Sequence, residues 1–358
     1  MTKVVSLMSR LTGEIRKNGI ANTYYKVKER KVKNLMLQNY ESERLAALPS
    51  KAELEKQKKR NFLKDLTFSI VVPTFNTPEE YLRQMIESVL GQTFCRVELC
   101  IADGSSDDHV EKVVREYQGT DSRIKYQRLP ENKGISENTN EALKMVTGDY
   151  VGLLDHDDVL EPHALYEMRI VLAKTPNADV IYTDEDKVSF DLTHYFEPHL
   201  KPDFNPDLLR SNNYICHFLV IKRELLERVG GFRGEFDGAQ DFDLVLRLTE
   251  EAECVIHIPK VLYHWRSHEA STAANPMSKL YAYEAGRRAV EAHLKRCKEP
   301  GIVTNTRFYG FYQTKYRVSR ELSMDLILFS CNGGNPKKIL NIFSKEFHRQ
   351  NTGNVIYY

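Results

Sequence analysis

The chain has 358 residues, of which 41% are hydrophobic and 28% are charged, and its formal net charge is +1. These values are ordinary for a globular protein and exclude wholesale disorder, and the near-neutral total gives no case for nucleic-acid binding. At roughly 150 residues per domain, the length predicts two domains, or one large domain with appendages.

Cysteine spacing and hydropathy narrow the protein class further. The six cysteines form no CxxC pair, no uncharged apolar run reaches the roughly 18 residues of a membrane span, and the N-terminus lacks the apolar stretch of a signal peptide. We therefore expect reduced thiols and a soluble, cytoplasmic protein.

Charge is unevenly distributed along the chain. Residues 1–64 hold 16 Lys/Arg and 6 Asp/Glu, a balance of +10, whereas the remainder holds 35 and 44, a balance of −9. Apolar residues scattered among the basic ones predict a helical N-terminal extension over residues 1–64. Such a segment can bind an anionic membrane surface, here the inner face of the plasma membrane. The alternatives are a solvated helical extension and an arm that joins copies of the chain in a homo-oligomer.

From residue 65 onward, strands and helices alternate. The first helix is expected to begin with a capping box formed by Thr77 and Glu80. Apolar, β-branched runs predict strands at 68–74, 97–102, 124–129 and 150–154. Strands that alternate with helices of 10–15 residues predict an α/β domain over residues 65–300, with a mostly parallel, Rossmann-like sheet covered by helices on both faces.

Residues 301–358 follow this domain. Residues 309–321 are expected to be a connector, and MDLILFSCN at 324–332 faintly repeats FSIVVPTFN at 68–76. We interpret residues 301–358 as a connector and the truncated or degenerate start of a second unit of the same fold. The alternative is an appendage that packs on the first domain or mediates dimerisation.

The loops after the predicted strands hold the candidate functional residues, because ligands of such sheets bind beyond the carboxyl ends of the strands. Asp103 could accept a hydrogen bond from a nucleotide, or could cap a turn. Asp155, Asp157 and Asp158 fall within four residues. Crowded carboxylates repel one another unless a cation lies among them, and oxygen ligands favour Mn²⁺ or Mg²⁺. A solvated acidic turn is the alternative.

Seven segments carry a family resemblance. The chain resembles family 2 glycosyltransferases, which are inverting enzymes of the GT-A fold, over about residues 66–297, and it is especially similar to bacterial enzymes that build rhamnan or O-antigen-type polysaccharides. The segments occur in the family's order: FSIVVPTFN at 68–76, SVLGQTF at 88–94, IADGSSDD at 101–108, NKGIS at 132–136, LLDHDD at 153–158, GAQDFDLVLRL at 238–248 and YHWRSHEAST at 263–272.

The resemblance implies a nucleotide site. The positions that match the nucleobase and ribose pocket are Thr74, Asn76 and Asp103, and those that match a loop near the nucleotide are Gly134 and Ser136. Where the family often has Arg before Asn, this chain has Thr139, so Lys133 is taken as a substitute cation.

The resemblance also implies a metal site and a general base. Asp155 and Asp157 match the DxD motif: Asp157 is expected to contact the metal directly, and Asp155 the metal, the ribose or a metal-bound water. Asp158 assists either of them and is a candidate contact to donor or acceptor. Asp241 matches the general base, although Gln240 stands before it where the family often has Glu. His268 matches a contact to metal or diphosphate, with His264 as a second candidate.

Four further residues have two interpretations each. Asp184 borders the acceptor pocket or lies in a solvated turn, and Trp265 stacks on a sugar or packs beneath the site. Asp243 lies two residues after Asp241, so its side chain points elsewhere on the helix and we expect it to cap or to pair. His217 lies in an apolar run, so we expect a strand histidine whose hydrogen bonds are satisfied, and not a ligand.

The resemblance implies an inverting, metal-dependent glycosyltransferase that moves a sugar from a UDP- or dTDP-sugar to a saccharide or lipid-linked saccharide in cell-surface polysaccharide synthesis. The alternative is a catalytically silent, nucleotide-sugar-binding subunit of a synthesis complex. A nucleotidyltransferase is disfavoured, because no Gly-rich, basic phosphate loop follows the first strand.

Overall fold

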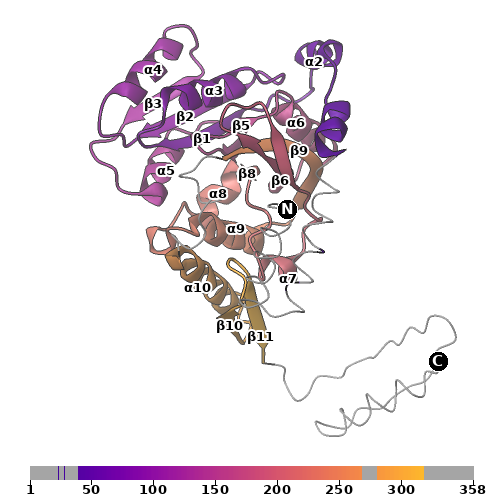
Figure 1. Ribbon diagram of the computed structural model, residues 1–358, viewed down its shortest axis with the longest axis vertical. Coiled ribbons are helices and arrows are strands. Elements are labelled where there is room, and N and C mark those ends of the chain that lie inside the picture. Colours follow the sequence, from indigo (N-terminus) through magenta and orange to yellow (C-terminus); the bar gives the residue numbers. More distant parts are fainter. Residues whose placement is uncertain (1–22, 24–27, 29–38, 268–279, 318–358) are drawn as a thin grey trace, which may run out of the picture. The chain divides into compact units, whose positions relative to one another are not determined.

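The computed structural model describes residues 23, 28, 39–267 and 280–317 (Figure 1). The chain divides into two units, residues 1–314 and 315–358, and the first of them holds nearly all of the described residues. The predicted repeat at 324–332 lies outside the described residues. Among the helices that are described, none combines the length and the apolar character that crossing a membrane would require.

A nine-stranded sheet forms the centre of the first unit (Figure 1). Its order is β3-β2-β1-β4-β8-β6-β9-β5, with β7 paired to β6. The half formed by β3, β2, β1 and β4 is parallel, as predicted. The other half is mixed, because β8 runs antiparallel to both of its neighbours. The nine strands are β1 (Phe68–Thr74), β2 (Val97–Asp103), β3 (Ile124–Arg128), β4 (Tyr150–Leu153), β5 (Val159–Leu160), β6 (Val180–Ser189), β7 (Tyr195–His199), β8 (Leu219–Lys222) and β9 (Val255–Ser267).

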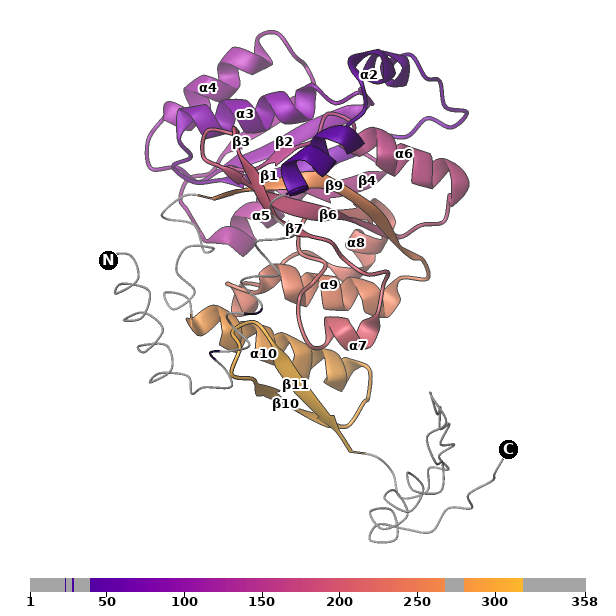
Figure 2. The same ribbon diagram turned by 45° about the vertical axis from the view of Figure 1, so that its right-hand side comes forward.

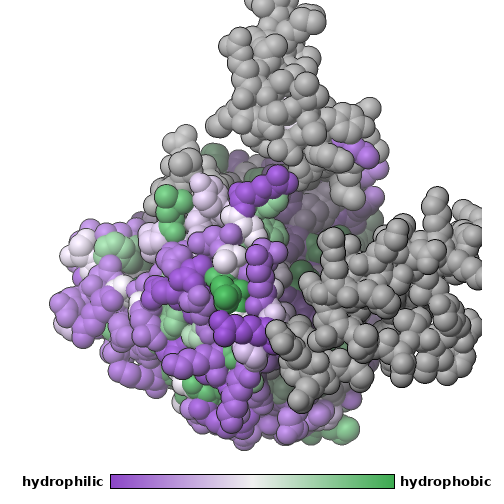
Figure 3. Space-filling model, turned by 90° about the horizontal axis from the view of Figure 1, so that it is seen from below, coloured by the Kyte–Doolittle hydropathy of each residue, from purple (hydrophilic) through white to green (hydrophobic). Residues whose placement is uncertain are grey.

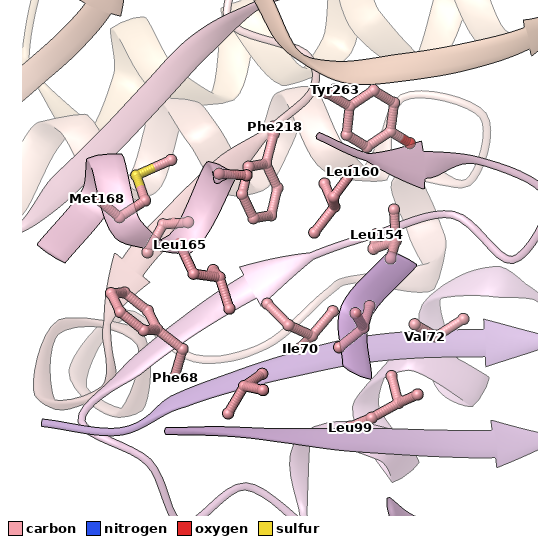
Figure 4. Close-up of a cluster of buried hydrophobic side chains, with 14 of the residues drawn as sticks. Phe68, Ile70, Val72, Leu99, Leu154, Leu160, Leu165, Met168, Phe218 and Tyr263 are labelled. Carbon is pink, nitrogen blue, oxygen red and sulfur yellow. The ribbon is translucent and has the colours of Figure 1, made fainter. Parts of the chain in front are cut away.

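Helices cover both faces of the sheet. On β1, Phe68, Ile70 and Val72 face one hydrophobic core, which Figure 4 shows, and Val71 faces the other. The first core is closed by α3 (Glu79–Leu90), α4 (His109–Gln118) and α6 (Ala164–Lys174). The second core is closed mainly by α5 (Ile135–Leu143), α8 (Arg223–Val229), α9 (Gln240–Glu251) and α10 (Leu280–Arg296). Further helices are α2 (Lys51–Lys58), α7 (Pro206–Leu209) and the 3₁₀-helix Gly234–Phe236.

The predicted capping box of α3 is wrong. The helix begins at Glu79 after Pro78, and no side chain caps it. Thr77 is buried instead, and its hydroxyl has no hydrogen-bond partner among the described residues. Burial of the loop before the helix therefore overrides the local capping signal.

The end of the N-terminal extension is fastened to the sheet. Residues 39–47 are helical and lie against β6 and β7 (Figure 2). The Tyr40 hydroxyl donates to Asp186 Oδ2 at 2.6 Å, and the Arg44 guanidinium donates to Glu161 Oε1 at 2.6 Å. Arg44 also lies over the Tyr195 ring, 3.4 Å from its centroid. Buried polar contacts thus cross the boundary that composition predicts at residues 64–65.

Part of the predicted connector is regular structure. β10 (Gly301–Asn305) and β11 (Tyr312–Tyr316) form a two-stranded sheet. The hairpin packs against α9 and α10, since the Tyr312 ring stacks on Phe242 with centroids 6.0 Å apart and a Cβ at Gly286 would meet the Tyr312 hydroxyl. The residues up to 314 therefore belong to the body of the first unit.

Candidate active site

Asp103 ends β2 and organises the first part of the site. Its carboxylate is fully buried. Oδ1 accepts from the Ser105 N–H at 2.9 Å and the Thr74 hydroxyl at 3.2 Å, and Oδ2 accepts from the Tyr126 hydroxyl at 2.8 Å. Arg128 lies 3.6 Å from Oδ2. Sequence reasoning missed Tyr126 and Arg128, although β3 pairs directly with β2 and sets Arg128 opposite Asp103.

Asn76 joins the loops that follow β1 and β2. Its N–H donates to the Ser105 hydroxyl at 2.8 Å, and its Oδ1 accepts from the Ser106 N–H at 2.9 Å. The structure therefore brings Thr74, Asn76 and Asp103 together at one edge of the sheet, as the sequence predicts.

The loop before α5 reaches the segment that leads into α9. Gly134 has a φ of +95°, a conformation that favours glycine, and a Cβ there would lie 3.2 Å from Asp237 Oδ2. The Ser136 hydroxyl donates to Asp237 Oδ1. Lys133 is more than half exposed, with its ammonium 3.9 Å from Glu131. Gly134 and Ser136 are thus held close to the start of α9.

The loop after β4 presents its three aspartates differently. Asp155 is partly exposed and lies 3.7 Å from His217 Nε2. The Asp157 carbonyl accepts from the Arg266 guanidinium. Asp158 is fully buried: Oδ1 accepts from the Arg266 N–H at 2.7 Å, and Oδ2 accepts from the Tyr263 hydroxyl. Because β9 occupies both oxygens of Asp158, its expected contact to donor or acceptor does not fit this geometry.

Negative charge accumulates in this loop. Burial raises the pKa of Asp158 well above its usual range, and the charges of Asp157 and Asp155 raise it further. The clustered carboxylates therefore repel one another, and a bound cation would reduce this repulsion.

His217 faces these aspartates, contrary to the expectation of a satisfied strand histidine. Burial disfavours its charged form, but Glu185, Asp155 and Asp158 outweigh burial and raise the pKa of His217 to about 9. Its Nδ1 lies 3.5 Å from Glu185 Oε2, and its ring stacks on Tyr263. At neutral pH it is therefore a cation within the site.

Lys201 holds the segment that carries His217. Its ammonium is fully buried and donates to Glu185 Oε2 at 3.0 Å, to the Ile215 carbonyl at 2.7 Å and to the His217 carbonyl. Burial favours neutral Glu185, yet Lys201 and the neighbouring histidines hold its pKa well below the usual range. No motif marks this segment, so sequence reasoning missed it.

Asp241 lies in the first turn of α9. Its Oδ2 accepts from the Asn213 amide at 2.9 Å. Burial raises the pKa of Asp241; the charge of Asp155 adds to this rise and that of His217 opposes it. The carboxylate is therefore within electrostatic reach of the loop after β4.

Asp243 has a different environment. It is fully buried and accepts from Arg233, and from Arg247 Nε at 2.9 Å. The prediction that Asp243 caps or pairs is confirmed, because two guanidinium groups bind its carboxylate.

Asp184 lies in the middle of β6, which continues to Ser189, so it is not part of a turn. It is buried and accepts from the Lys201 N–H at 2.8 Å, and it lies 2.8 Å from His257 Nε2. This burial contradicts the solvated turn. The carboxylate also does not border an acceptor pocket as expected, because it binds protein groups instead.

The β9 residues divide into two groups. Trp265 is partly buried and lies near the site, since its ring centroid is 5.6 Å from that of His217. His264 is buried between Asp186 and Glu161, so its two nitrogens already have carboxylate partners. His268 lies outside the described residues.

A second cluster joins α9 to α10. Among the described residues, Glu250, His293 and Cys297 are the one group whose metal-ligating atoms lie within 4.8 Å of one another. Arg296 Nε donates to Glu250 Oε2 at 2.7 Å, and Arg210 Nε donates to His293 Nε2 at 3.1 Å. Cationic side chains already occupy Glu250 and His293, so the cluster is a polar network between the helices.

Comparisons with known proteins agree with the fold and the motifs. The model of the family described as Glycosyl transferase family 2 matches residues 69–230. The chain is 45% identical over 231 residues to the protein y4gI of Sinorhizobium fredii, a match that covers 64% of this chain and 25% of that protein. It is 39% identical over 238 residues to the O-antigen biosynthesis protein RfbC of Myxococcus xanthus, covering 66% and 19%. The chain thus spans a quarter or less of the length of these two relatives.

A solved structure shows the same architecture. Residues 1–349 of S. aureus TarS, crystallised with UDP-GlcNAc, superpose with a TM-score of 0.52 at 20% sequence identity. The match covers 64% of this chain and 66% of that one. This likeness confirms the predicted α/β GT-A fold.

Proposed function

We propose, from the premise that this chain belongs to glycosyl transferase family 2 through residues 69–230, that it transfers a sugar from a nucleotide diphosphate donor to a saccharide or lipid-linked saccharide acceptor. We assign the reaction to cell-surface polysaccharide synthesis, because one relative is named as an O-antigen biosynthesis protein. A UDP- or dTDP-sugar is the proposed donor, and the UDP-GlcNAc complex of TarS supports the first of these.

One observation supports the proposal above the others. Asp241, the candidate base, and Asp155, at the candidate donor site, are far apart in the chain, yet one loop reaches both: Asn213 donates to Asp241 at 2.9 Å, and His217 Nε2 lies 3.7 Å from Asp155. Inversion requires a base on one side of the anomeric carbon and the leaving diphosphate on the other. Asp241, which Asn213 holds, supplies the base, and Asp155 lies on the side of the leaving diphosphate.

The proposed step is a direct displacement. Asp241 accepts the proton of an acceptor hydroxyl while that oxygen bonds to the anomeric carbon. The bond from the anomeric carbon to the diphosphate oxygen breaks, and the nucleotide diphosphate leaves with the electron pair. Asn213 orients Asp241 for the incoming hydroxyl, and His217 places positive charge near the departing diphosphate.

The residues after β4 fit a divalent cation. Asp155 and Asp157 offer hard oxygen ligands, which suit Mn²⁺ or Mg²⁺ shared with substrate phosphates. Asp158 would support the loop instead, since β9 holds its carboxylate. When bound, the ion would neutralise charge that develops on the leaving diphosphate.

Donor hydrolysis tests the proposal. The protein should release nucleoside diphosphate from one member of a panel of UDP-, dTDP- and GDP-sugars when Mn²⁺ is present, and should lose this activity in EDTA and regain it when Mn²⁺ is restored. Failure to hydrolyse any donor, with binding of one shown by calorimetry, would favour the silent subunit instead.

The raised pKa of Asp241 predicts a pH dependence. A base acts only when ionised, so transfer should fall as pH drops through the pKa of Asp241, which burial sets above the usual 3.8. The Asn213 amide favours the ionised form, and Asn213→Ala should therefore move the acidic limb of the kcat profile to higher pH. If the acidic limb of the profile does not move, Asn213 does not influence the ionisation of the base.

Membrane contact is proposed for the basic extension, residues 1–64. Its charge balance of +10 should bind the protein to anionic vesicles at low salt and release it at high salt, because exposed charges are screened. Flotation of the full chain with phosphatidylglycerol vesicles at two salt concentrations measures this. Phosphatidylcholine vesicles are the control, and binding that ignores charge and salt would contradict the proposal.

A further inference from the structure

The turn between β10 and β11 carries exposed aromatic side chains that the proposed reaction does not use. Phe308, Tyr309 and Phe311 are each about half exposed. The Tyr309 ring stacks on Tyr283 of α10, with centroids 4.9 Å and planes 16° apart, and Phe308 meets Phe311 edge-on at 6.5 Å. Gly310 has a φ of +76°, which lets the turn close between these rings. The rings are therefore ordered by one another while remaining open to solvent.

A hydrogen-bonded segment links this turn to the candidate base. The Asn212 amide donates to the Gly310 carbonyl at 3.1 Å. The next residue, Asn213, donates to Asp241 at 2.9 Å. Neighbouring residues of one loop thus bind the aromatic turn and the base, which links the turn to the base through two successive residues.

Tyr312 continues the row of rings toward the base. Its N–H donates to the Ser211 carbonyl at 2.8 Å, and its ring stacks on Phe242, the residue after Asp241. Burial raises the pKa of Tyr312, and the charge of Asp241 raises it further, so the two groups are within electrostatic reach. Tyr312, which follows Phe311 in the chain, therefore packs between the exposed turn and the helix that carries the base.

We propose that the turn at residues 306–311, together with Tyr283, is a platform on which a saccharide acceptor stacks while its terminal hydroxyl reaches Asp241. This inference rests on the proposed function, because the base must face the acceptor. Sugar rings present apolar C–H faces as well as hydroxyls, and ordered aromatic rings offer them flat contact at low entropic cost.

The surroundings of the platform favour a saccharide over a lipid surface. Membrane-binding surfaces gather apolar residues in one broad patch rimmed with free basic groups. On the part of this end of the molecule that the described residues show, hydrophobic residues are scattered among hydrophilic ones (Figure 3). The Arg307 guanidinium lies 4.8 Å over the Phe308 ring, so it belongs to the stack itself.

The test compares aromatic with aliphatic side chains in the full chain. The probes are an array of bacterial cell-surface polysaccharides and their oligosaccharide fragments, and the variants are Phe308→Leu/Tyr309→Leu and the ring-preserving Tyr309→Phe. Wild type should bind one saccharide class. The double leucine variant should weaken this binding about tenfold, and Tyr309→Phe should stay within about twofold of wild type.

Donor hydrolysis and thermal unfolding accompany the binding measurement and should be unchanged in both variants. The platform is refuted if wild type binds no saccharide on the array, if the leucine variant binds as wild type does, or if the substitutions abolish binding to anionic vesicles instead. Failure of the proposed function gives a different result, namely no hydrolysis of any nucleotide sugar by wild type.

Discussion

Asp241→Asn should lower kcat for sugar transfer by about 10²–10⁴-fold, the usual contribution of a general base, while the KM for the donor stays within about twofold. The amide has nearly the same shape as the carboxylate and can keep a hydrogen bond to the Asn213 side chain, but it cannot take the acceptor proton. Initial rates of transfer at saturating donor and acceptor measure this loss.

Two results would contradict the assignment of the base. Transfer at the wild-type rate would show that another group accepts the proton. A loss confined to the KM of the donor would place Asp241 in donor binding. The unfolding temperature of Asp241→Asn should match that of wild type, because the new amide can keep the hydrogen bond from Asn213 and the carboxylate forms no ion pair within the described residues.

Asp243→Ala should destabilise the protein by about 3–5 kcal/mol, the range for breaking a buried ion pair from one side. The substitution leaves the buried Arg247 without its carboxylate and removes the ion pair of Arg233. For a unit of this size, the melting temperature should fall by roughly 5–8 °C. Thermal unfolding followed by circular dichroism measures the change.

Asp241 and Asp243 are therefore a matched pair: two aspartates on one helix, with opposite expected effects. Asp243→Ala should retain kcat per folded molecule at a temperature where it stays folded. If Asp243→Ala instead loses turnover without losing stability, the division of roles between the two residues is wrong.

The strands and the loops that follow them could be predicted from the sequence. A β-branched run defines β1 and a short apolar run defines β4, and parallel strands must bring Thr74, Asp103 and Asp155 to the same edge. The local sequence was sufficient to predict these strands and loops, because the strand period and the chain direction fix where the last side chain of each strand lies.

The partners of these residues could not be predicted. Lys201, Asn213 and His217 come from the connection between β7 and β8, where no periodicity marks them. The sequence indicates a turn at Asp184 because three successive acidic residues, 184–186, are unusual in a buried strand. Its charge is tolerated because His257, 73 positions along the chain, lies beside it.

The anchoring of residues 39–47 has a consequence for where the folding unit begins. Tyr40 and Arg44 supply donors to two carboxylates, of Asp186 and Glu161, that also clasp His264. A fragment that started at the first family motif would remove both donors and expose these acids to water on one side, leaving His264 as their partner from β9. The folding unit therefore extends upstream of the first family motif. The helix at residues 39–47 belongs to the scaffold that positions β9 at the site.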